Sequence, residues 1–265
     1  MAPSKNVLPV RCNAEAASRS SEPRVWGSVT TSVRTLIAGF VVVALATAAE
    51  SGQAEPKKEK AGGFITVRSP ITSATYYSVR RQSEGMLAAD ARIIVFDIQP
   101  GTSDYGNCLN LAHYIESIKG ANTVAFVREP LHGHGVMVAL AADELVISRK
   151  AELGDIGRDE KVIGKGMIAE YRELAARRKP AHQAVVLGML DKKYKVWKVV
   201  TAGGPRYVLD EDLKKLENEE QIKSKEVLIE VGQLGNFTGD ELRQLDMAQL
   251  NAENWTEVAE WYGMS

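Results

Sequence analysis

The stretch from residue 129 to residue 157 constrains the fold of this chain most strongly. It contains a glycine-bearing turn at 132–135, an apolar run of small residues at 136–142, a β-branched run at 145–147 and a second glycine turn at 152–157. Glycines let a backbone approach closely or adopt a positive φ. A turn that leads into a buried helix presents N–H groups and the positive end of the helix dipole to an anion. The sequence therefore predicts a turn–helix–strand unit that could form an oxyanion hole.

Strand and helix patterns alternate through the middle of the chain. Strands are expected at 64–67, 92–98, 122–127 and 145–147, and helices at 73–89, 107–119, 136–142, 156–179 and 181–190. The run at 92–98 is almost wholly apolar, which is typical of a parallel strand buried on both faces. This alternation predicts an α/β core with parallel strands and right-handed crossovers.

The C-terminal part has a different pattern. Two alternating runs, 194–200 and 206–209, flank a glycine-rich turn and predict a β-hairpin. A helix is expected after Asp210, a strand at 227–231, and a further helix that begins at Thr238 with a capping-box pattern. A short amphipathic tail with two tryptophans is expected at 251–265.

The run Gly135–Leu145, GVMVALAADEL, resembles the nucleophile-bearing helix of the ClpP/crotonase superfamily. It is most similar to the membrane-associated serine proteases of the NfeD-like and signal peptide peptidase A type. The resemblance extends over about residues 64–247. It implies an α/β fold, a spiral of ββα units with a mostly parallel sheet, here followed by a C-terminal β-hairpin and helices.

The same resemblance assigns positions to the catalytic residues. With Gly135 set on the glycine of the motif, His134 falls on its alanine and Gly133 falls on the nucleophilic serine. Glycine has no hydroxyl with which to attack a carbonyl. The resemblance therefore implies a serine-protease homologue that is catalytically impaired or inactive.

Two further elements of the family site have counterparts here. The NfeD-like proteins carry a general-base lysine near the start of the next helix, for which Lys161 and Lys165 are the candidates. Their oxyanion turn reads P-G-G, where this chain has Gly101 followed by Thr102 in place of the second glycine. A lysine base must be partly desolvated to lose its proton near neutral pH.

Three alternatives stay open. An active peptidase could use another nucleophile, Ser103, Ser148 or Thr102, with His132 or His134 as its base. A crotonase-type acyl-CoA enzyme could use the backbone amides of Gly101 and Gly133 as its oxyanion hole. A metal could bind His132 and His134 with a third ligand from His113, His182 or a carboxylate, but no spacing signal supports it, and no metal or cofactor is expected.

The N-terminus predicts export. Residues 1–34 are polar and basic, and an apolar run at 35–48 ends in Ala46-Thr47-Ala48, a cleavage pattern typical of a signal peptide. The alternative is a retained N-terminal anchor. We expect a leader at 1–49, a flexible linker at 50–63, a ClpP/NfeD-like domain at 64–250 and the tail at 251–265. Cleavage would remove Cys12 and leave Cys108 as the only cysteine.

The composition limits the partners. Thirty-three basic and 34 acidic residues give a net charge of −1, which argues against general nucleic-acid binding. The family resemblance implies a homo-oligomer that contacts peptide or membrane-protein segments. The N-terminal segment predicts an exported protein that is periplasmic or membrane-associated, and the resemblance implies a role in membrane-associated protein quality control or as an assembly or binding domain.

Overall fold

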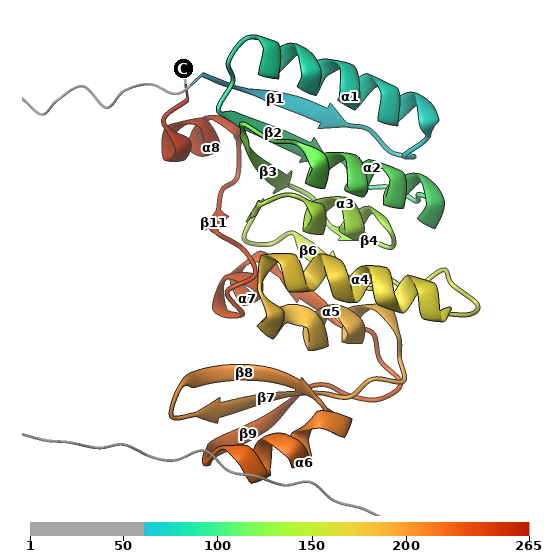
Figure 1. Cartoon of the computed structure of the whole chain (residues 1–265), viewed down its shortest axis with the longest axis vertical. Coiled ribbons are helices and arrows are strands. Elements are labelled where there is room, and N and C mark those ends of the chain that lie inside the picture. The colour runs from blue at the N-terminus through green and yellow to red at the C-terminus, as the bar shows by residue number, and fades with distance from the viewer. Residues whose placement is uncertain (1–60, 265) are drawn as a thin grey trace, which may run out of the picture. The chain divides into compact units, whose positions relative to one another are not determined.

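The central element of the fold is a five-stranded sheet (Figure 1). The computed structural model describes residues 61–264 of the chain. The leader and all but the last residues of the linker lie outside this part. The strand order is β1-β2-β3-β5-β11, and every neighbouring pair is parallel. The strands are β1 (Gly62–Val67), β2 (Ile93–Ile98), β3 (Asn122–Val127), β5 (Glu144–Ile147) and β11 (Leu250–Asn251). The predicted α/β class and the mainly parallel sheet are confirmed.

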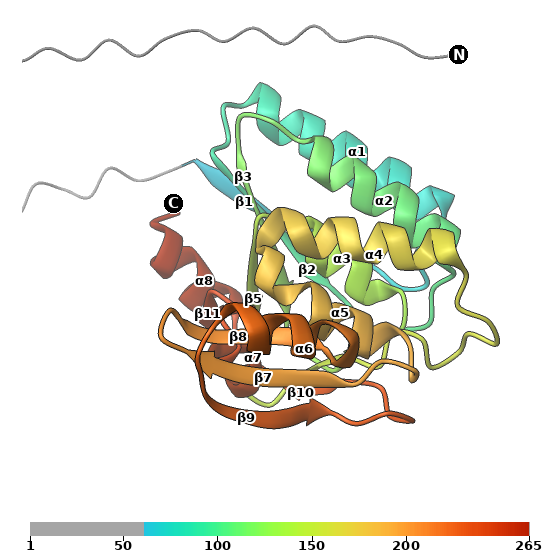
Figure 2. The same ribbon diagram turned by 60° about the horizontal axis from the view of Figure 1, so that its bottom comes forward.

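The larger core lies between one face of this sheet and a set of helices. Helices α1 (Ser73–Ala88), α2 (Tyr105–Ser117) and α3 (Gly135–Ala141) follow the first strands, and α4 (Lys165–Arg178) and α5 (Gln183–Leu190) continue the layer (Figure 2). In β1, Ile65 and Val67 point into this core. Helix α3 is buried along its whole length, because its small residues let it pack closely against α2 and the sheet.

The opposite face of the sheet is covered by a helix from the C-terminal part of the chain. Helix α8 (Trp255–Tyr262) places Val258 and Tyr262 against Val95, Phe126 and their apolar neighbours. The Tyr262 hydroxyl donates to the Glu144 carboxylate at 2.5 Å. The amphipathic spacing predicted for 251–265 thus belongs to a helix whose apolar side packs on the sheet of the domain.

Two small sheets complete the described part. Strands β7 (Val196–Thr201) and β8 (Gly204–Leu209) form the predicted hairpin, and β9 (Ile222–Ile229) pairs with β7, with α6 (Asp210–Glu219) packed beside them. Strand β6 (Glu152–Gly154), where a turn was expected, pairs with β4 (Leu131–His132) and β10 (Asn236–Thr238). The predicted capping box of α7 (Gly239–Gln244) is present: the Thr238 side chain accepts from the Glu241 N–H, and the Glu241 carboxylate accepts from the Thr238 N–H.

The segment between β6 and α4 is a loop, although a helix was predicted from residue 156. The Ile156 N–H donates to the Met189 carbonyl at 2.9 Å, and α4 begins only at Lys165, followed by a short turn, η1 (Pro180–His182). These contacts hold residues 156–160 in an irregular path beside the helix layer. Within residues 61–264, none of the helices combines the length and the apolar character that crossing a bilayer requires.

Candidate functional site

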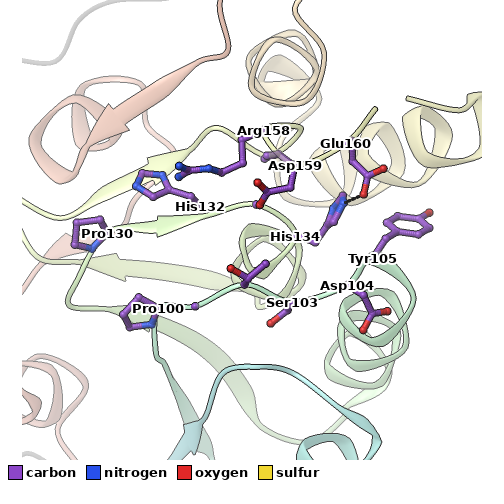
Figure 3. A pocket seen from close by; sticks show the side chains of 14 residues that line it. Pro100, Ser103, Asp104, Tyr105, Pro130, His132, His134, Arg158, Asp159 and Glu160 are labelled. Atoms are coloured by element: carbon purple, nitrogen blue, oxygen red, sulfur yellow. Dashed lines mark hydrogen bonds and ion pairs between the residues drawn. The ribbon is translucent and has the colours of Figure 1, made fainter. Parts of the chain in front are cut away.

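A cavity of about 520 Å³ lies where the chain leaves β2 and β3 (Figure 3). Its walls come from three segments: the turn at 100–105 after β2, the segment 130–134 before α3, and the loop at 156–160. The strands are parallel, so their carboxyl ends meet at one edge of the sheet, and segments that follow different strands converge there.

The turn after β2 has a backbone that only glycine fits. Gly101 has a φ of +148°, and a Cβ placed on it would lie 2.4 Å from the Cβ of Ser69. The Ser69 hydroxyl donates to the Gln99 carbonyl at 2.9 Å and so fixes the neighbouring segment. Thr102 follows and lines the cavity. The structure therefore brings Gly101 and Thr102 to the same cavity as Gly133 and His134.

At Gly133 the cavity wall has no side chain, and the space where one would lie is open. Its φ is +65°, and a Cβ placed on it would have a carboxylate oxygen of Asp159 as its nearest neighbour, at 4.0 Å. Its own N–H donates to the Asp155 carbonyl at 3.2 Å. That N–H is already used inside the fold, so it does not point at a substrate carbonyl as the crotonase-type alternative requires.

His134 is the more deeply buried of two buried polar residues that line the cavity, the other being Ser103. His134 is 5% exposed and lies at the N-cap of α3. Its Nδ1 lies 2.9 Å from the Tyr171 hydroxyl and its Nε2 lies 2.9 Å from a Glu160 carboxylate oxygen. Complete burial holds the pKa of Tyr171 well above its ordinary value. The phenol thus keeps its proton. A carboxylate can only accept, so Nε2–H donates to Glu160, and in the neutral ring Nδ1 then accepts from the Tyr171 hydroxyl.

This arrangement leaves His134 without a free acceptor. Both ring nitrogens are occupied by Tyr171 and Glu160, so the ring has no lone pair directed at Gly133. A general base must reach the proton that it abstracts. The role of His134 is therefore structural: its hydrogen bonds connect the start of α3 to α4 and to the loop at 156–160.

The predicted lysines lie elsewhere. Lys161 and Lys165 are exposed, and neither is among the residues that line the cavity. Exposure to water stabilises the charged form of an ammonium group. Gly135, the third position taken from the family motif, is buried at the start of α3, where a Cβ would lie 2.9 Å from Leu131 Cδ1. Its role here is packing.

Two of the three candidate hydroxyl nucleophiles are engaged in structural contacts, and the third, Thr102, lines the cavity. The Ser103 Oγ accepts the Ile71 N–H at 2.8 Å, and the Ser148 hydroxyl donates to the Glu253 carboxylate. Within residues 61–264, neither hydroxyl is hydrogen-bonded to a histidine. Burial raises the pKa of the nearby Cys108 thiol to about 12, so this cysteine is not present as a reactive thiolate at neutral pH.

The four histidines of the chain do not converge. His113 lies 3.3 Å from Glu170, and His182 is buried, with its pKa lowered to about 4 by that burial. His132 lines the cavity, and its Nδ1 is buried with no hydrogen-bond partner in the described part of the chain. That part holds no group of three or more side chains arranged to bind a metal.

Sequence reasoning missed the partners of His134. Glu160 was visible only as one of several acids after the second glycine turn, and Tyr171 only as a member of an apolar helix stripe. Asp159, which faces Gly133, belongs to the same acidic group. A buried histidine needs polar partners, and that requirement was the available signal. The chain alone could not indicate which acid would supply one.

Comparison with known proteins supports the fold. No family model and no curated protein matches the chain. Among solved structures, similarity extends to enzymes such as an enoyl-CoA hydratase/carnithine racemase from Magnetospirillum magneticum, with 14% identity, a TM-score of 0.46, and coverage of 77% of this chain and 71% of that one.

A more similar structure is a protease of this fold, the 1510-N membrane-bound stomatin-specific protease. A lysine-to-alanine mutant of it in complex with a substrate peptide shows 12% identity and a TM-score of 0.53, over 77% of this chain and 80% of that one. A serine-to-alanine mutant gives the same identity and TM-score, over 76% and 84%. At 12% identity, this likeness shows that the chain has the ClpP-like fold of the protease, as its sequence motif predicted.

Proposed function

We propose that this protein is a ClpP-type domain that binds peptide segments in the cavity beside Gly133 without cleaving them. One observation carries the proposal: the position of the family serine holds Gly133, and the buried histidine beside it, His134, has both ring nitrogens engaged. A hydrolase of this type needs a nucleophile and a base in contact. The fold is retained, while the family positions of this pair hold Gly133 and the exposed Lys161 and Lys165.

Peptide is the ligand class that we propose, for two reasons. The similar protease binds a substrate peptide. The cavity of this chain also combines apolar lining from Pro100, Pro130 and Ile156 with charged groups at Arg158 and Asp159, a mixture that suits a peptide backbone and its side chains. We propose that the apolar segment at 35–48 brings the domain to a membrane, where it acts in protein quality control or assembly.

The absence of catalysis can be tested with a serine-directed fluorophosphonate probe and a fluorogenic peptide library. We expect neither labelling nor cleavage by the full chain. We also expect none from Gly133→Ser, because the new hydroxyl would still lack a free base. Cleavage by the unaltered protein that disappears in a cavity variant would overturn the proposal.

Binding can be tested on an array of overlapping peptides from a stomatin homologue. We expect a subset of peptides to bind, and Thr102→Trp, which fills the cavity, to weaken that binding at least about tenfold. Thr256→Trp, an exposed position on α8, is the matched control and should bind normally. Equal binding by both variants would place the peptide outside this cavity.

A further inference from the structure

One edge of the five-stranded sheet is open over part of its length. The sheet ends at β11 on one side and at β1 on the other (Figure 1). Strand β11 has only two residues, whereas β1 has six, GGFITV, none of them charged and none of them proline. Proteins normally protect a long edge with charges, proline or a covering element. Within residues 61–264, no strand pairs with the outer side of β1.

The outward-facing groups of β1 can be assigned from its pairing with β2. The Arg92 N–H donates to the Ala61 carbonyl at 2.7 Å, and the Gln99 N–H donates to the Val67 carbonyl at 3.0 Å. Backbone direction alternates along a strand, so Phe64, Thr66 and Arg68 direct their N–H and C=O groups away from the sheet.

The open part of the edge is short and well defined. A Cβ on Gly62 would lie 2.8 Å from the Met264 side chain, so the segment after α8 covers the start of β1. Beyond that point a groove of about 470 Å³ follows the edge, with Phe64, Thr66 and Arg68 on one side and α1 on the other. The α1 wall includes Ala74 and Ser78, whose small side chains leave room for an incoming strand.

The side chains along this edge are suited to pair with those of an identical strand that runs in the opposite direction. Phe64 stacks on Trp255 with ring centroids 5.6 Å apart, and Trp255 is still 45% exposed. An arginine, Arg68, stands at the other end of the open edge, and Thr66 lies between them. An antiparallel copy centred on Thr66 would bring Arg68 of each chain opposite Phe64 of the other, on the same face of the sheet. That placement gives two cation–π contacts and a threonine pair.

We propose that a second copy of this chain occupies the groove, with its β1 antiparallel to the first about a two-fold axis at Thr66. Each outward N–H of one edge then meets a carbonyl of the other, and the two five-stranded sheets become one continuous sheet. The self-complementary order of aromatic, threonine and arginine favours an identical partner over an unrelated strand. The cavity beside Gly133 takes no part in this contact.

The test uses the mass of the full chain in solution, measured by sedimentation. We expect a dimer. Thr66→Pro removes an N–H that faces away from β2, so it should weaken dimerisation by roughly tenfold or more while the circular dichroism spectrum is retained. Thr66→Val keeps the N–H and should remain dimeric. Arg68→Glu should also weaken the dimer, because it replaces the cation opposite Phe64.

The register has its own test. In a Cys12→Ser background, Thr66→Cys should form a disulfide-linked dimer on mild oxidation, and Lys223→Cys, exposed on β9, should not. A monomeric wild-type chain would overturn the proposal, as would a dimer that Thr66→Pro leaves unchanged. A monomer whose Phe64 and Thr66 amides exchange slowly with deuterium would show that a segment of the same chain covers the edge instead.

Discussion

Alanine substitutions at Gly101 and Gly120 can separate the cost of backbone strain from the cost of a steric clash. Both have positive φ values, but a Cβ on Gly101 would meet Ser69, whereas a Cβ on Gly120 would have nothing within 4 Å. We expect Gly101→Ala to lower the free energy of unfolding by about 3 kcal/mol and Gly120→Ala by about 1 kcal/mol. Urea denaturation measures both. Equal losses would mean that the Ser69 contact adjusts without cost.

The hydrogen bonds of His134 give a second prediction at the residue scale. Tyr171→Phe removes the hydroxyl that donates to His134 and leaves a buried nitrogen unpaired. We expect a loss of about 1–3 kcal/mol in the free energy of unfolding. Tyr105→Phe is the control, since the Tyr105 ring meets His134 edge-on with centroids 5.3 Å apart and its ring contact survives the change. Similar losses in both variants would contradict the assignment.

Sequence reasoning reached these residues unevenly. The motif singled out Gly133 and His134, and the structure places them in one cavity with Gly101 and Thr102, because segments that follow parallel strands meet at one edge of the sheet. It could not show that the Gly133 N–H donates to Asp155, nor that Glu160 and Tyr171 hold His134. Such contacts depend on the path of a loop whose sequence, at 155–164, has no regular period.

At the scale of the elements, α8 makes the clearest prediction. Val258 is fully buried against the sheet, so Val258→Ala should cost about 2 kcal/mol of unfolding free energy through lost apolar contact and a residual cavity. Thr256→Ala, exposed on the same helix, should change stability by less than about 0.5 kcal/mol. Chemical denaturation compares the two. A neutral Val258→Ala would mean that α8 detaches easily.

Most elements could be predicted from periodicity and turn residues, and their misplacements share one cause. The sequence predicts a helix from residue 156, where the structure has a loop, and an amphipathic tail at 251–265, where the structure has a helix packed on the domain. In both cases a tertiary contact decides the outcome: the Ile156 N–H bonds to Met189, and α8 covers an apolar sheet face. The sequence of a segment does not by itself indicate which distant residues the segment will contact.

For the whole molecule, His182 predicts how stability depends on pH. Its pKa falls from 6.5 to about 4, first because it is buried and then because Arg178 and Lys179 lie near it. Between pH 6.5 and 4 the unfolded chain therefore binds a proton that the folded chain does not, and stability falls as the pH is lowered. Urea midpoints at several pH values should show a flatter dependence for His182→Gln. An unchanged slope would contradict the role of this residue.

The position of α8 also has a consequence for biosynthesis. This helix covers the second face of the sheet, yet it is translated long after the strands β2 and β3 that it covers. A nascent chain would hold an uncovered apolar surface until α8 leaves the ribosome. A chain that stops before residue 255 would keep that surface exposed and would be a natural client for chaperones or proteases.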